Sequence, residues 1–157
     1  MRVSRCLILA ARALGLTACG GGQVRRVSEP AASIQQLSVT EDGSWNLQLR
    51  LQNYSSIPMR FDQVELDVET NNQSAGHLSQ AVGIDIGPES ADVVELHLQP
   101  SSMARLAVAD ALASQQRLPY RLSGQIQATP EDKKQRQFDL DSRDSLSPAP
   151  GLNGVLR

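Results

Sequence analysis

The sequence is poor in aromatic, cysteine and histidine residues, and each shortage excludes a class of protein. Aromatic residues make up 3% of the 157 residues, too few for a platform on which bases or sugars stack. Two cysteines and two histidines exclude a zinc finger, a disulfide-dense scaffold and an iron–sulfur protein. The formal net charge of −2 offers no basic field to nucleic acid. No apolar run reaches the roughly 18 residues that a bilayer-spanning helix needs.

The first 18 residues have the features of an export signal. Arg2 and Arg5 precede a mostly apolar stretch, residues 6–18, which has a signal-peptide length and is too short to span a membrane. Arg12 interrupts this stretch, and a charge there costs about 2.5–3.5 kcal/mol on translocon-insertion scales. Because the neighbouring leucines offset much of that cost, Arg12 does not exclude export.

The signal ends in Leu16-Thr17-Ala18-Cys19-Gly20, which resembles the bacterial lipobox. The resemblance implies that the Cys19 sulfur receives a diacylglyceryl group and that the chain is then cut between Ala18 and Cys19. It also implies that the new amino terminus is acylated, as with palmitate. Gly20 resembles the residue after the cysteine in lipoproteins that are passed on to the outer membrane. Two plainer interpretations stay open: an ordinary N-terminal helix, and a secretory signal with a chance cysteine.

The expected membrane contact is covalent, through the acyl chains on Cys19. Removing Arg2, Arg5 and Arg12 with the signal leaves 12 of the 15 basic residues against 17 acidic ones, a net charge of −5. A net-acidic body is not drawn to anionic lipid, whereas two or more acyl chains anchor a protein essentially permanently. Residues 19–32 include three consecutive glycines and a proline. They predict a flexible tether with a reach on the order of 20 Å.

Residues 33–141 predict one two-sheet β-sandwich of the fibronectin or immunoglobulin type, since the length of the chain suits a single domain. Apolar and polar residues alternate along residues 45–52, the pattern of a half-buried strand. Residues 59–68 also alternate, with a slip near Asp62 that suits a β-bulge. Turn residues separate further strands, which we expect at residues 34–39, 81–86, 93–98, 120–126 and 137–140. A polar turn is expected over residues 71–76.

One segment, residues 101–116, breaks the strand period. It is rich in alanine, contains neither glycine nor proline, and begins with two serines that can cap a helix. It predicts a single inserted α-helix, which is only partly buried against the sheet edges because Asp110 lies among its apolar residues. Residues 142–157 contain several prolines and glycines and are expected to form an irregular tail.

The order of these elements resembles the late-embryogenesis-abundant type 2 proteins, whose domain is also called the water-stress and hypersensitive-response (WHy) domain. The turn after the leucine-rich strand keeps Asn53 and, displaced, Pro58 of the family's Asn-Pro-Asn-like turn. Tyr120-Arg121-Leu122-Ser123-Gly124 matches the family's late strand. The resemblance covers residues 34–140. It implies a fibronectin-like sandwich and a stress-protective or interaction role, and it implies no catalytic residue and no cofactor.

Histidines and aspartates are the candidate metal ligands, and neither set has the required pattern. His77 and His97 lie twenty residues apart without metal-ligand spacing. Asp139, Asp141 and Asp144 lack the glycine and the glutamate of an EF-type calcium loop. A solvated strand end explains these aspartates more simply, and no metal site is predicted.

Three carboxylates share one face of a predicted strand. Glu65, Asp67 and Glu69 alternate with apolar residues and could in principle form an acid–base pair. The solvent side of a half-buried strand is the simpler interpretation. Neither Gly-x-Ser-x-Gly nor a phosphate-binding glycine loop occurs in the sequence. Asn53 is interpreted as a turn residue that caps backbone groups.

Three functions come into consideration. The first is a non-enzymatic lipoprotein, anchored to the outer membrane through Cys19 and facing the periplasm, whose sandwich binds or protects other envelope macromolecules. The second is a carrier of a lipid or other apolar ligand, which needs a cavity between the sheets. The third is a hydrolase that uses strand carboxylates, disfavoured because no base–nucleophile pair is present. We adopt the first, with the membrane and an envelope protein or lipid as expected partners and no nucleic acid.

Overall fold

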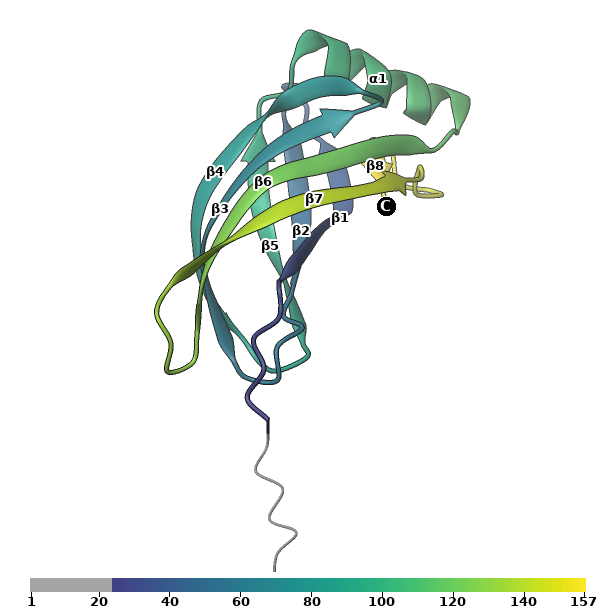
Figure 1. Cartoon of the computed structure of the whole chain (residues 1–157). Coiled ribbons are helices and arrows are strands. Elements are labelled where there is room, and N and C mark those ends of the chain that lie inside the picture. Colours follow the sequence, from purple (N-terminus) through teal and green to yellow (C-terminus); the bar gives the residue numbers. More distant parts are fainter. Residues whose placement is uncertain (1–23) are drawn as a thin grey trace, which may run out of the picture.

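The computed structural model describes residues 24–157 as two packed antiparallel sheets. The predicted export signal, its cleavage site after Ala18, and Cys19 lie outside the described residues. One sheet has the strand order β5-β2-β1-β8 and the other has β4-β3-β6-β7 (Figure 1). The predicted mainly-β sandwich with one helix is therefore confirmed. Its elements are β1 (Ala31–Val39), β2 (Trp45–Gln52), β3 (Met59–Thr70), β4 (Gln73–Ile86), β5 (Ala91–Leu98), α1 (Ser102–Ser114), β6 (Leu118–Pro130), β7 (Arg136–Leu146) and β8 (Val155–Leu156).

The core lies between the sheets and is built from the alternating side chains of the strands. In β2 every second residue, from Trp45 to Leu51, is buried, because successive side chains of a strand point to opposite faces. The register of β3 shifts against both β4 and β6 between Phe61 and Gln63, which confirms the bulge predicted near Asp62. The extra residue lets Phe61 and Val64, three positions apart, both reach the core.

The hairpin between β3 and β4 is tighter than predicted. The sequence predicts a polar turn over residues 71–76, but only Asn71 and Asn72 form it, with φ of 48° and 59°. Positive φ at both central residues is the type I′ turn, whose twist suits two paired strands and which asparagine tolerates. The strand expected at residues 81–86 therefore begins at Gln73.

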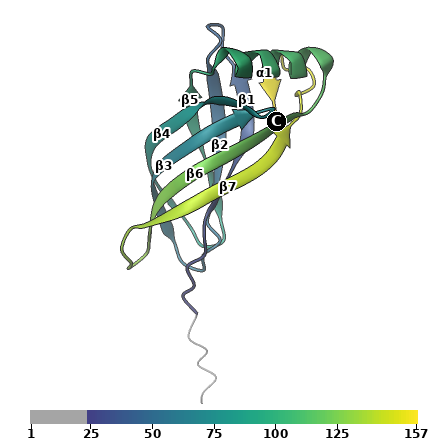
Figure 2. The same ribbon diagram turned by 45° about the horizontal axis from the view of Figure 1, so that its top comes forward.

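Helix α1 connects the two sheets and lies across one end of the sandwich (Figures 1 and 2). Ser101 caps it by accepting a hydrogen bond from the backbone N–H of Ala104. The helix rests on β3, β4 and β6 and buries only three side chains, all alanine or valine. Met103 and Leu106 stay exposed, so the predicted partial burial is confirmed. No helix within residues 24–157 has the length and apolar character needed to cross a membrane.

The sandwich begins earlier and ends later in the sequence than the predicted limits, residues 33 and 141. β1 begins at Ala31, two residues before the expected start at residue 33. β7 continues to Leu146, inside the segment 142–157 for which an irregular tail is predicted, and β8 then pairs with β1. Leu146 and Leu156 are both buried, so apolar side chains hold this segment to the core.

Candidate functional site at the N-terminal end of the sandwich

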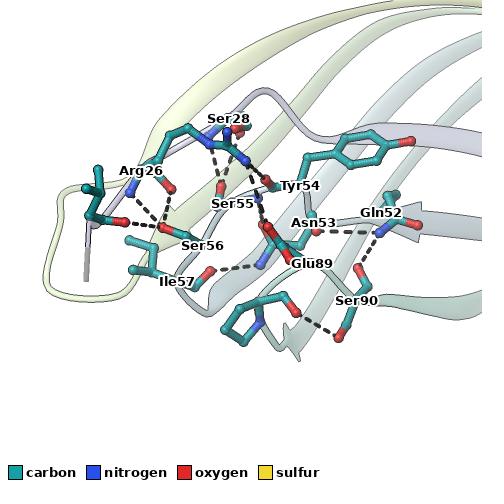
Figure 3. Close-up of polar contacts among 12 residues, drawn as sticks. Arg26, Ser28, Gln52, Asn53, Tyr54, Ser55, Ser56, Ile57, Glu89 and Ser90 are labelled. Atoms are coloured by element: carbon teal, nitrogen blue, oxygen red, sulfur yellow. Dashed lines mark hydrogen bonds and ion pairs between the residues drawn. The ribbon is translucent and has the colours of Figure 1, made fainter. Parts of the chain in front are cut away.

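Asn53 directly follows β2, at the end of the sandwich opposite α1 (Figure 1), and Figure 3 shows its polar contacts. Its side chain is fully buried, and its Nδ2 donates to the carbonyl oxygens of Ile57, Ile86 and Gly87 at 2.9, 3.1 and 2.9 Å. Its Oδ1 accepts the backbone N–H of Ser55 at 2.9 Å. An amide has two N–H bonds, so the three carbonyls share them. Asn53 thereby joins the end of β2, the start of β3 and the β4–β5 connection.

A segment near the described N-terminus docks on the loop that follows Asn53. Ser55 is buried, and its Oγ accepts the backbone N–H of Ser28 at 2.9 Å. The Oγ of Ser56 accepts the N–H of Arg26 at 2.8 Å and donates to the carbonyl of Val24 at 2.7 Å. We call residues 24–28 the docked segment. They fall within the predicted flexible tether, yet their backbone is hydrogen-bonded to the sandwich.

Ion pairs add to this docking. Arg25 lies 2.9 Å from Glu131 and 3.2 Å from Asp132, in the turn between β6 and β7. Arg26 donates to the carbonyl of Tyr54 at 3.3 Å and lies 3.9 Å from Glu89. Since these side chains are largely exposed, each pair contributes little alone.

This docking joins residues about 30 positions apart, so no local sequence pattern predicts it. Alternation and turn propensity report on neighbours along the chain. The adjacent serines at 55 and 56 resemble ordinary turn residues, and the adjacent arginines at 25 and 26 resemble a polar linker. Pro58 lies in the same loop, and its carbonyl accepts the N–H of Glu131 at 2.9 Å.

The late strand that carries the family resemblance ties the two sheets together. The hydroxyl of Tyr120, on β6, accepts the backbone N–H of Ile34, on β1 in the other sheet, at 3.0 Å. Burial raises the pKa of Tyr120 above its ordinary value of 10.0, and the bond from Ile34 opposes that rise. A Cβ on Gly124 would lie 2.1 Å from the carbonyl oxygen of Glu65. Only glycine fits so close to β3.

The two histidines are not brought together. His77, on β4, lies 2.9 Å from Asp67, and His97, on β5 in the other sheet, contacts Asn46 at 2.6 Å. Both contacts lie on the exposed surface. Within residues 24–157 no group of three histidine, cysteine or acidic residues could hold a metal ion.

The strand carboxylates have separate partners on the outer face of their sheet. Gln63 donates to Glu65 at 2.8 Å, and Arg121 donates to both oxygens of Asp141 at 2.8 and 2.9 Å. The hydrogen bond from Arg121 lowers the pKa of Asp141 below its ordinary value of 3.8. Arg121 also lies 3.9 Å from Glu69. The pairing with Arg121 stabilises Asp141 in its ionised form, whereas a general acid needs a raised pKa.

Three surface hollows within residues 24–157 bear on the carrier hypothesis. One of about 450 Å³ opens between the docked segment, Pro58 and Pro88. Another of about 280 Å³ opens beside Tyr120, and an apolar one of about 240 Å³ lies between α1 and Trp45. None of the three is lined by the side chains expected to surround a carrier's cavity, which include Leu49, Leu66 and Ile126.

Several solved structures of low sequence identity are similar to this chain. A solution structure of an Arabidopsis thaliana protein is 9% identical over 83% of this chain and 84% of that chain, with a TM-score of 0.48. A solution structure of a protein titled a putative late embryogenesis abundant protein is 12% identical over 77% and 72%, with a TM-score of 0.47. A crystal structure from Archaeoglobus fulgidus is 14% identical over 76% and 97%, with a TM-score of 0.42.

The family itself is shown by the sequence. No curated protein matches the chain significantly. The family model described as late embryogenesis abundant protein matches residues 48–144, more than half of the chain. The match begins within β2 and ends within β7, so it spans both sheets, the Asn53 turn and the Tyr120 strand. The chain is therefore a member of the late embryogenesis abundant family that this model, LEA_2, describes.

Proposed function

We propose that this protein is a non-enzymatic lipoprotein, anchored to the outer membrane through acylated Cys19 and facing the periplasm, whose folded sandwich binds or protects other envelope macromolecules. One observation carries the non-enzymatic part. The polar side chains at the turn that bears the family resemblance are directed to the chain's own backbone: Asn53 binds three carbonyls and one N–H. The amide of Asn53 therefore stabilises the fold and is not available to a substrate.

Protection by this chain would have to act through the surface of a folded domain. Disordered protective chains work by being polar and lacking a core, whereas this sandwich buries a large apolar cluster between its sheets. Along each strand, the side chains between the core residues point to the outer faces of the sandwich. These faces carry exposed charges, among them Asp67, Glu95 and Asp139. These faces offer hydrogen bonds and charge to a partner.

Intact mass and membrane fractionation test the anchoring. The full-length chain is expressed in a Gram-negative host beside Cys19→Ala. We expect the wild type in the outer membrane at the mass of residues 19–157 plus acyl chains, and the variant without acyl chains and released from the membrane. If both chains stay soluble and uncleaved, the lipoprotein proposal is wrong and only the folded domain remains.

A drying assay tests the protective role. A labile reporter enzyme is dried and rehydrated with the chain, and its recovered activity is measured against equal masses of an unrelated acidic protein. Gly124→Val, which places side-chain atoms against the backbone of Glu65, serves as a matched variant with a disrupted fold. We expect the native chain alone to raise the recovery. Equal recovery with all three proteins would refute the role.

A further inference from the structure

We infer that the N-terminal end of the sandwich is a membrane-facing surface whose two lysines contact anionic lipid headgroups, while α1 is held farthest from the bilayer. The inference rests on the proposed acylation of Cys19. The surface consists of the docked segment and three connections: residues 53–58, 87–90 and 131–135. All lie at the end opposite α1 (Figure 1).

The first step is the length of chain between the anchor and the sandwich. Because Val24 is already held by Ser56, only residues 20–23 separate it from Cys19. A chain spans at most about 3.3–3.6 Å per residue, so Val24 cannot lie more than about 18 Å from the acylated cysteine. If none of residues 19–32 were held by the sandwich, the start of the folded body at residue 32 could lie up to roughly 45 Å from Cys19. The docked segment thus keeps this end near the headgroups.

The second step is the fixed direction of the sandwich. β2 begins at Trp45, at the end of the sandwich covered by α1, and ends at Gln52, at the end that carries the docked segment. Eight residues at about 3.3 Å each place the two ends roughly 25 Å apart. With one end limited to about 18 Å from Cys19, the sandwich cannot stand upright with α1 toward the bilayer while the docked segment stays in place. When the sandwich stands upright on its docked segment, the exposed Met103 and Leu106 on α1 lie on the aqueous side.

The third step is the distribution of positive charge. The chain has only two lysines, Lys133 and Lys134, and both are exposed in the β6–β7 turn at this end. Arg25 pairs with the neighbouring Glu131 and Asp132, which neutralises part of the acid there. Among residues 24–157, neither lysine takes part in an ion pair. The body is acidic as a whole, but both of its lysine ammonium groups lie at the end that carries the docked segment.

An exposed aromatic ring accompanies these charges. Tyr54 follows Asn53 in the same end loop and is 51% exposed, although tyrosine has a large apolar body. Tyrosine is enriched at the membrane–water interface, where its ring meets the headgroup level and its hydroxyl stays hydrated. The surface thus combines the two residue types, aromatic and basic, that favour contact with lipid headgroups.

The scarcity of lysine provides a direct test. The acylated protein is inserted into vesicles containing phosphatidylglycerol, and its amines are labelled with a membrane-impermeant ester and quantified by peptide mass spectrometry. Leu106→Lys adds a reporter amine on α1, where the leucine is 64% exposed. Relative to the detergent-solubilised protein, we expect labelling about fivefold slower at each native lysine, which corresponds to ~1 kcal/mol. The labelling rate of the reporter amine on α1 should be unchanged.

Two controls separate the contributions of tether and charge. Vesicles of phosphatidylcholine should give weaker protection of the lysines, because the attraction to anionic lipid is lost. Inserting a run of about eight glycine and serine residues after Gly22, which lengthens the free tether by roughly 26 Å at full extension, should raise the labelling of Lys133 and Lys134 in phosphatidylglycerol vesicles. The end of the sandwich is then no longer held close.

The failures are distinguishable. If intact mass shows no acyl chains, the proposed function itself is wrong. If the protein is acylated but the native lysines and the α1 reporter are labelled alike, the lipoprotein proposal stands and the membrane-facing surface is refuted. Equal protection in the two vesicle types, or full protection after the insertion, would also overturn it.

Discussion

Replacing Asn53 by alanine should remove the main polar junction of the sandwich. The side chain bonds three carbonyls and the N–H of Ser55, and it is fully buried, so its removal leaves buried polar groups without their partner. One amide supplies two donors and one acceptor for these contacts, or about three hydrogen bonds at roughly 1 kcal/mol each. We therefore expect Asn53→Ala to lower the free energy of unfolding by about 3 kcal/mol, a large share of the roughly 5–15 kcal/mol typical of a domain.

Urea unfolding followed by tryptophan fluorescence measures this loss. Trp45 is the chain's one tryptophan and is buried, so its emission reports on the core. Gln52→Ala is the matched control, because Gln52 is next in the chain and only partly buried, and its amide donates at the surface to Ser90 at 3.0 Å; it should cost less than about 1 kcal/mol. Asn53→Asp keeps the shape but loses the donors, and should be worse than alanine. A loss below about 1 kcal/mol for Asn53→Ala would refute the argument.

Three further predictions concern single side chains. Gly124→Ala should cost about 2–5 kcal/mol, because its Cβ meets the backbone of Glu65 at a positive φ. Gly87→Ala, whose Cβ would make only an ordinary van der Waals contact with the Ser90 hydroxyl at 3.8 Å, should be nearly neutral in the same urea titration. Thr70→Val should raise the melting temperature, because the buried Thr70 hydroxyl has no hydrogen-bond partner and such a group costs about 1–3 kcal/mol; an unchanged or lower melting temperature would contradict this. Because the folded-state pKa of Tyr120 is raised, the Tyr120 hydroxyl contributes fully to the free energy of unfolding below about pH 10. This contribution is lost as the pH rises through the folded-state pKa. Tyr120→Phe should therefore be less stable than wild type at about pH 7, and the difference should narrow in unfolding curves recorded above about pH 10.

The sequence predicted the elements that depend on local pattern. The alternation of residues 45–52 predicted β2, in which every second side chain is buried. The slip near Asp62 predicted the bulge, because two apolar residues three positions apart must face the same core. The turn of the β3–β4 hairpin was predicted too long, because polar residues such as Gln73 also occur in edge strands.

The contacts of the candidate site were harder to predict, because their partners are distant in sequence. Asn53 was identified as a turn residue, but its bonds to Ile86 and Gly87 cross more than 30 positions. The docked segment depends on Ser55 and Ser56 in the same way. Hydrogen bonds of this kind follow from how the strands are arranged, and no local period encodes them.

The pairing of the first strand with the last has a consequence for how the chain folds. Leu37 on β1 pairs with Leu156, one residue from the end of the sequence, and the Ser147 and Arg157 backbones bond each other at 2.6 and 2.8 Å. The outer edge of β1 therefore stays open until Val155 and Leu156 have been synthesised. Sandwiches dominated by such distant pairings fold in milliseconds to seconds. Deleting β8 should slow refolding little and speed unfolding, because the last contacts to form are the first to open.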